Sequence, residues 1–135
     1  QVSQIVTDGA CHLGARIIYN AVADLPLDEL EIVIVENVGN LVCPAEFDIG
    51  EDAKIAVLSI TEGEDKPLKY PMLFQEAQAA VLTKTDLLPY VPFDLDNCLG
   101  YIRQVSGQMP VFEVSALKDE GTDEWVEWLV SRRRV

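Results

Sequence analysis

The sequence predicts an α/β domain with a mostly parallel sheet flanked by helices. Several apolar runs are continuous rather than alternating, which is typical of strands covered on both faces. Amphipathic helical segments lie between these runs, and polar segments follow the ends of several of them. Because ligands bind beyond the carboxyl ends of parallel strands, these polar segments are where functional residues are expected. We therefore expect a single α/β domain over residues 1–135.

The predicted strands are short runs rich in β-branched residues. They span residues 2–7, 31–36, 54–60, 79–83 and 111–114. The predicted helices have apolar residues three and four positions apart, which gives each helix one buried stripe. They span residues 11–25, 94–105 and 122–129. Pro26 ends the first of these helices, and Thr122 is the expected N-cap of the last.

Composition excludes several classes of function. Ten Lys and Arg against 23 Asp and Glu give a net charge of -13, so neither nucleic acid nor an anionic membrane is an expected partner. The longest apolar runs, at 32–35 and 55–58, fall far short of the roughly 20 residues that span a bilayer. Three cysteines and no leader-like start argue against a secreted disulfide scaffold. These features predict a cytoplasmic protein with reduced thiols.

Three residues are candidate metal ligands: Cys11, His12 and Cys43. Nickel, copper and zinc favour thiolate and imidazole donors. A four-coordinate site would need a carboxylate, a water or the same residues from a second copy, and the last option predicts a metal-bridged dimer. The alternative is that Cys11 is a small buried residue in the first turn of a helix and His12 lies at the surface. Cys98 lies on an apolar helix face and is expected in the core.

Two loops predict a guanine site. Thr83, Lys84 and Asp86 follow one strand, where a carboxylate can accept two N–H bonds from guanine and a lysine stem can lie along the ring. Ser115 and Ala116 follow the next strand, where a backbone N–H can meet the guanine oxygen. The alternative for the first loop is an ordinary polar turn.

A third loop predicts a phosphate switch. Glu36 ends a strand and would hold Mg²⁺ through water, and Gly39 would approach a γ-phosphate. The alternative is an ordinary Asn-rich turn. A phosphate-binding loop needs glycines followed by lysine, and none of the eight glycines here is followed by lysine.

Several motifs together closely resemble the HypB family, the hydrogenase nickel-incorporation GTPases. They are Cys11-His12-Leu13 and residues 36–51, 61–71, 83–86, 112–116 and 124–128. The resemblance implies a P-loop NTPase-like fold that uses GTP and Mg²⁺. It also implies that Cys11, His12 and Cys43 bind Ni²⁺ or Zn²⁺.

The resemblance further implies a function and its partners. In the family, GTP binding and hydrolysis drive dimerisation and metal release, so that nickel enters [NiFe]-hydrogenase. The implied partners are a second copy of the chain through the metal site, the hydrogenase large subunit and other nickel-maturation proteins. Lys84 and Asp86 would read guanine, while Glu36 and Gly39 would belong to the γ-phosphate and Mg²⁺ switch.

The sequence departs from the family pattern in two places. Thr83 stands where the family usually has Asn, which predicts weaker guanine binding because a hydroxyl replaces an amide. The family's opening strand, P-loop and first helix precede the position of Gln1, so we expect the carboxyl-terminal part of a GTPase domain that does not hydrolyse GTP alone. The alternative function is a non-enzymatic nickel- or zinc-binding dimerisation module without nucleotide control.

Overall fold

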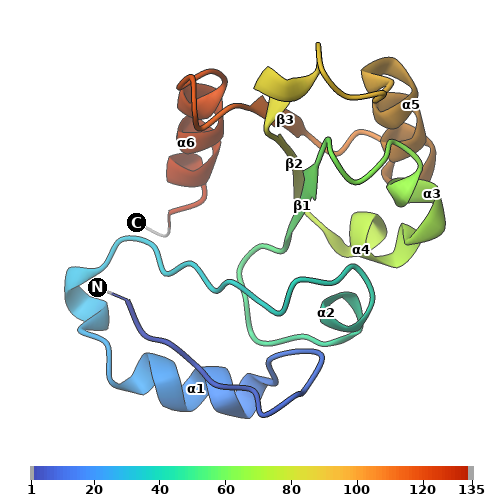
Figure 1. Ribbon diagram of the computed structural model, residues 1–135. Coiled ribbons are helices and arrows are strands. Elements are labelled where there is room, and N and C mark those ends of the chain that lie inside the picture. Colours follow the sequence, from blue (N-terminus) through green and yellow to red (C-terminus); the bar gives the residue numbers. More distant parts are fainter. Residues whose placement is uncertain (1, 134–135) are drawn as a thin grey trace. The chain divides into compact units, whose positions relative to one another are not determined.

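The computed structural model describes residues 2–133, which divide into two compact units (Figure 1). We call residues up to Asp52 the loop unit and residues from Ala53 onward the sheet unit. The expected single domain over residues 1–135 stays a prediction. Within residues 2–133, no helix is both long and apolar enough to cross a lipid bilayer.

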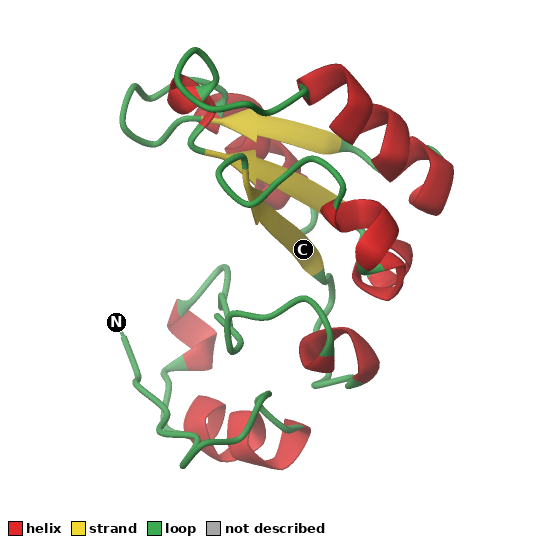
Figure 2. Ribbon diagram, turned by 45° about the vertical axis from the view of Figure 1, so that its right-hand side comes forward, coloured by secondary structure: helices red, strands yellow, loops and turns green. Residues whose placement is uncertain are grey.

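The sheet unit is built on three parallel strands, β1 (Ile55–Ser59), β2 (Ala79–Thr83) and β3 (Val111–Val114). Their order is β1-β2-β3, and all three run in the same direction (Figure 2). The register aligns Thr83 with Ser59 on one side and with Val114 on the other, so the carboxyl ends lie at one edge. The parallel strands predicted from the continuous apolar runs are confirmed.

Helices cover both faces of this sheet. They are α3 (Lys66–Lys69), α4 (Pro71–Glu76), α5 (Leu95–Ser106) and α6 (Thr122–Ser131). Figure 1 shows α6 on one side of the strands and the other three helices on the opposite side. Helix α5 begins where the Asp94 carboxylate accepts a hydrogen bond of 2.9 Å from the Asn97 amide, a side-chain N-cap.

The core of the sheet unit lies between these layers. The large side chains with at most 2% of their surface exposed include Phe74, Leu58, Ile60, Leu82, Ile102 and Cys98. Burying each large apolar side chain contributes about 1.5–3 kcal/mol. Cys98 is therefore a core residue, as predicted, and burial raises the pKa of its thiol to about 11.

The start of α6 differs from the prediction. Gly121, not Thr122, is the N-cap, and it adopts a left-handed φ of 71°. A Cβ at this position would overlap the backbone carbonyl of Glu113, so the close approach to β3 requires glycine. Thr122 is the first helical residue, and its hydroxyl donates to the Asp119 carboxylate over 2.7 Å.

Over residues 2–52, the loop unit contains two short α-helices and a single 3₁₀ turn. They are α1 (Ala15–Ala23), η1 (Leu27–Glu29) and α2 (Cys43–Glu46). The helix predicted over residues 11–25 thus begins four residues later than expected. The backbone of residues 11–13 is instead bonded to side chains from a distant turn, described below, and is not available for a helical turn.

Residues 2–7 and 31–36 do not form the predicted strands. Among residues 2–133, β-ladders join only β1, β2 and β3. β-Branched residues favour an extended backbone, but a strand also needs a second strand aligned with it. The composition of one segment cannot supply that neighbour, and the side chain of Ile34 is 79% exposed.

Candidate metal and nucleotide sites

The loop unit brings its Cys-His segment against the turn formed by residues 37–43. The Asn37 side-chain oxygen accepts hydrogen bonds of 2.8 Å from the backbone amides of Leu13 and Val38. The bond from Leu13 crosses 24 residues of sequence, whereas Val38 is the next residue along the chain. The bond to Asn37 holds Leu13, which is buried, and so places Cys11 and His12 just before α1.

A second amide side chain joins the two cysteine segments. The Asn40 amide nitrogen donates to the Cys11 carbonyl over 2.7 Å. Its oxygen accepts from the backbone amides of Val42, over 3.1 Å, and Cys43, over 2.9 Å. Cys43 is the first residue of α2, and Pro44 follows it, where a missing N–H costs nothing.

The three predicted metal ligands meet in pairs. The Cys11 sulfur lies 3.6 Å from Nδ1 of His12. The pKa of the Cys43 thiol is raised, first by hydrogen bonding with Cys11 and then by burial and by the nearby Cys11 and Glu46 charges. The His12 ring stacks on Phe47, with centroids 3.8 Å apart and an interplanar angle of 1°.

This donor set fits a soft or borderline metal ion. Two thiols and an imidazole are the ligand types that Ni²⁺ and Zn²⁺ accept. Over the described chain, 2–133, no three cysteine, histidine or acidic side chains converge closely enough to form a ready metal cage. Coordination would therefore need side-chain rotation or a further donor. The alternative for Cys11 does not hold, because this residue is exposed and precedes α1.

The predicted guanine loop lies at the carboxyl edge of the sheet. Thr83 ends β2, and Lys84 follows with a left-handed φ of 62°. A lysine in this conformation costs about 1–3 kcal/mol, and such strain is found mostly at functional positions. Asp86 follows in the 3₁₀ turn η2 (Thr85–Leu87).

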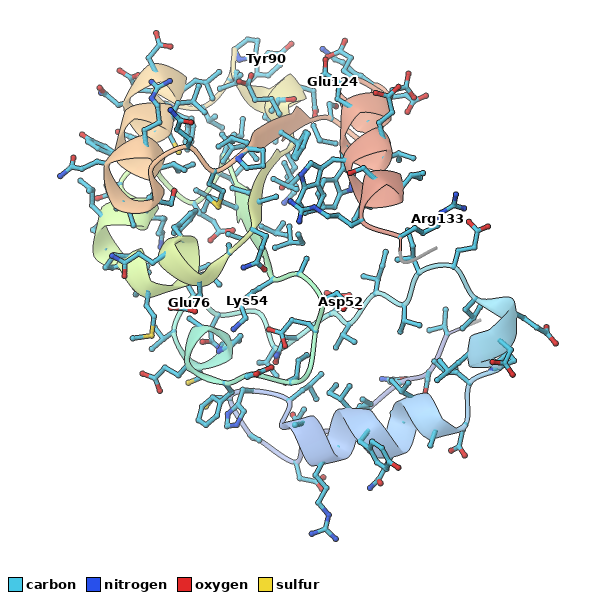
Figure 3. All side chains as sticks on the ribbon, turned by 180° about the vertical axis from the view of Figure 1, so that it is seen from behind. Asp52, Lys54, Glu76, Tyr90, Glu124 and Arg133 are labelled. Atoms are coloured by element: carbon cyan, nitrogen blue, oxygen red, sulfur yellow. The ribbon has the colours of Figure 1, made fainter. Side chains whose placement is uncertain are left out.

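The serine loop after β3 meets the guanine loop. The hydroxyl of Ser115, which is fully buried, donates to Asp86 Oδ1 over 2.7 Å. The same hydroxyl accepts from the Lys118 amide over 3.2 Å. One carboxylate oxygen of Asp86 is thereby oriented, while Lys84 and Ala116 remain exposed. The exposed side chain of Tyr90 lies beyond this turn (Figure 3).

Glu36 and Gly39 lie in the loop unit on either side of Asn37. Both are exposed, and a Cβ added to Gly39 would meet no atom within 4 Å. The backbone therefore does not require glycine at position 39. Their proposed contact with phosphate and Mg²⁺ stays a prediction.

Sequence reasoning missed Asn37, Asn40 and Phe47. Asparagine is favoured in turns because its side chain bonds to nearby backbone amides. The position of Asn40, three residues before Cys43-Pro44, could have predicted its bonds to the Val42 and Cys43 amides. The bonds to residues 11 and 13 had no local signal, because they cross 29 and 24 residues.

A parallel sheet with oriented polar loops at its carboxyl edge defines a nucleotide-binding class of α/β domain. A model of that class, described as CobW/HypB/UreG, nucleotide-binding domain, matches residues 1–113. The chain belongs to this CobW/HypB/UreG family.

Several relatives that this chain matches are HypB proteins. The hydrogenase maturation factor HypB of Escherichia coli K12 is 51% identical over 130 residues, which cover 96% of this chain and 45% of that protein. HypB of Azotobacter vinelandii is 51% identical over 132 residues, covering 96% and 43%. The chain thus spans less than half the length of these relatives.

Two solved structures share the fold. A crystal structure of HypB from Helicobacter pylori in complex with nickel matches with a TM-score of 0.92 and 33% identity, over 96% of this chain and 62% of that one. HypB from Archaeoglobus fulgidus matches with a TM-score of 0.87 and 31% identity, over 93% and 67%. The predicted P-loop NTPase-like α/β class is confirmed.

Proposed function

We propose that the chain belongs to a nickel-binding GTPase metallochaperone that helps insert nickel into [NiFe]-hydrogenase. The family match and the relatives named hydrogenase maturation factor support this function. The single observation that carries it is that the Asn40 side chain bonds both the Cys11 carbonyl and the Cys43 backbone amide, which brings the two cysteines together beside the imidazole of His12. The match to a HypB structure in complex with nickel supports the choice of metal.

In this proposal Cys11, His12 and Cys43 bind Ni²⁺, or Zn²⁺, as cargo. One chain supplies three donors, so a second copy would complete the site and form a homodimer. The hydrogenase large subunit and other nickel-maturation proteins would receive or supply the metal. The cytoplasm is the proposed location.

The sheet unit would couple nucleotide to this metal site. Asp86, oriented by Ser115, would accept guanine N–H groups, with Thr83, Lys84 and Ala116 completing the base site. Glu36 and Gly39 would respond to the γ-phosphate and Mg²⁺. GTP hydrolysis needs a phosphate-binding loop, which these 135 residues do not contain, so we expect no hydrolysis by this chain alone.

The alternative is a metal-binding dimerisation module without nucleotide control. One observation favours it: all three metal donors lie in the loop unit, whereas the guanine loops lie in the sheet unit. Under this alternative, Ni²⁺ alone would produce the dimer.

A nickel titration of the intact protein tests the proposal. We expect Cys43→Ala to lose tight Ni²⁺ binding, whereas Cys98→Ala, which removes a core thiol, should retain it. The apparent mass of the nickel-loaded protein, measured with and without GTP, then separates the two functions. A dimer that forms only with GTP supports the GTPase, and a dimer that forms with Ni²⁺ alone supports the module without nucleotide control. Equal Ni²⁺ affinity in Cys43→Ala and wild type would contradict the metal site.

A further inference from the structure

Asn40 is bonded to both cysteine segments at once. Its amide nitrogen donates to the Cys11 carbonyl, and its oxygen accepts from the Cys43 backbone amide. The two cysteines are 32 positions apart in the sequence, yet a backbone group of each is hydrogen-bonded to the same side chain. A carboxamide suits this position because it offers a donor and an acceptor on one carbon.

The segments that Asn40 joins have little structure of their own. Cys11 lies in an exposed turn, before α1 begins at Ala15. Cys43 begins α2, which is only four residues long, and helices this short are not stable by themselves. The distance between the two thiols therefore depends on contacts such as that of Asn40.

We propose that Asn40 is a positioning residue for the metal site, holding the Cys11 and Cys43 thiols at the separation that lets both bind one Ni²⁺ ion. This inference rests on the proposed metal site. Asn40 itself does not bind the ion, because its three polar contacts are all to backbone groups. Outer groups that orient metal ligands typically change affinity by about 10- to 100-fold.

The two halves of the amide can be separated by substitution. Asn40→Asp keeps an oxygen for the Val42 and Cys43 amides, and aspartate is as good a cap as asparagine. It loses the donor to Cys11 and places a carboxylate oxygen against the carbonyl. If Asn40 served only to cap α2, the Asn40→Asp variant would therefore bind Ni²⁺ as wild type does. The added negative charge would by itself tighten cation binding, so weaker binding would have to come from geometry.

The experiment is a Ni²⁺ titration of the intact protein, followed by the thiolate-to-nickel absorption band, with thermal unfolding measured in parallel. We expect Asn40→Ala and Asn40→Asp to weaken Ni²⁺ binding by at least about tenfold and to diminish the band. Asn40→Asp should unfold at a temperature close to that of wild type. The matched control is Asn20→Ala, which removes an exposed amide on α1 and should bind as wild type.

Wild-type affinity and absorption in Asn40→Asp would overturn the inference and leave a capping role. Cys11→Ala and Cys43→Ala separate this result from a failure of the proposed function. If these two variants lose nickel while Asn40→Asp does not, the metal site stands and only the role of Asn40 is wrong. If they too bind Ni²⁺ as wild type, the metal site is wrong, and the inference is overturned with it.

Discussion

The sheet unit and the loop unit hold their functional residues by different means. In the sheet unit, the register of three strands brings Thr83 and Val114 to one edge, and the loops that follow meet there. In the loop unit, side-chain amides bond to backbone groups far away in the sequence. A sheet positions loops through many ladder bonds, so each bond matters little. A loop unit depends on a few side chains, so a single substitution has a larger effect on its site.

Two glycines give the largest contrast between the units. Gly121→Ala forces a Cβ against the Glu113 carbonyl at a left-handed φ, and we expect it to destabilise the protein by about 2 kcal/mol or more. Gly39→Ala meets open space in the loop unit and should change stability by less than about 0.5 kcal/mol. Urea unfolding of both variants measures the difference. Equal losses at the two positions would contradict this contrast between the units.

Ser115→Ala sharpens the comparison at the nucleotide site. The substitution removes a buried hydroxyl that orients Asp86, a hydrogen bond to a charged group that is typically worth about 1.5–3 kcal/mol. We expect guanine-nucleotide affinity of the intact protein to fall by about tenfold. Nickel affinity measured without nucleotide should not change, since the proposed metal ligands lie in the other unit.

The control for this variant is Ser106→Ala. The Ser106 hydroxyl donates to the Ile102 carbonyl of its own helix, over 2.7 Å, away from the guanine loop. Fluorescence titration with a labelled guanine nucleotide measures the nucleotide affinity of both variants. A loss as large in Ser106→Ala as in Ser115→Ala would remove the specific role of Ser115.

The buried thiol of Cys98 makes the stability of the sheet unit depend on alkaline pH. Burial raises the pKa of this thiol from 9.0 to about 11, so the folded state binds its proton more tightly than the unfolded state. This contribution to stability is fully present below pH 9 and is lost as the pH rises toward about 11. In Cys98→Ala this part of the decline should be absent. Parallel urea titrations across the range measure it, and identical slopes for the two proteins would refute it.

The sheet unit was easier to predict from the sequence than the loop unit, because strand patterns are local whereas the side-chain bonds of the loop unit join distant residues. The strands at residues 54–60, 79–83 and 111–114 were predictable, since a central parallel strand is apolar on both faces. The meeting of the Asp86 and Ser115 loops followed from that topology, because parallel strands end at one edge.

The loop unit was harder to predict. The segments at residues 2–7 and 31–36 have strand composition but lack an aligned partner strand among the described residues. Composition shows whether a segment favours an extended backbone, but it does not show whether a partner strand is aligned with it. The bonds made by Asn37 and Asn40, and the stacking of His12 on Phe47, join residues that no short pattern links. The candidate ligand types were visible in the sequence, but the contacts that position them were not.

The central claim is that Cys11 and Cys43 bind one nickel ion together. X-ray absorption at the nickel edge of the intact, nickel-loaded protein tests it most directly, because sulfur and lighter donors scatter differently. We predict sulfur neighbours around nickel in the wild type, fewer in Cys11→Ala and in Cys43→Ala, and an unchanged number in Cys98→Ala. A nickel shell made only of nitrogen and oxygen, or one unchanged by either Cys11→Ala or Cys43→Ala, would contradict the claim.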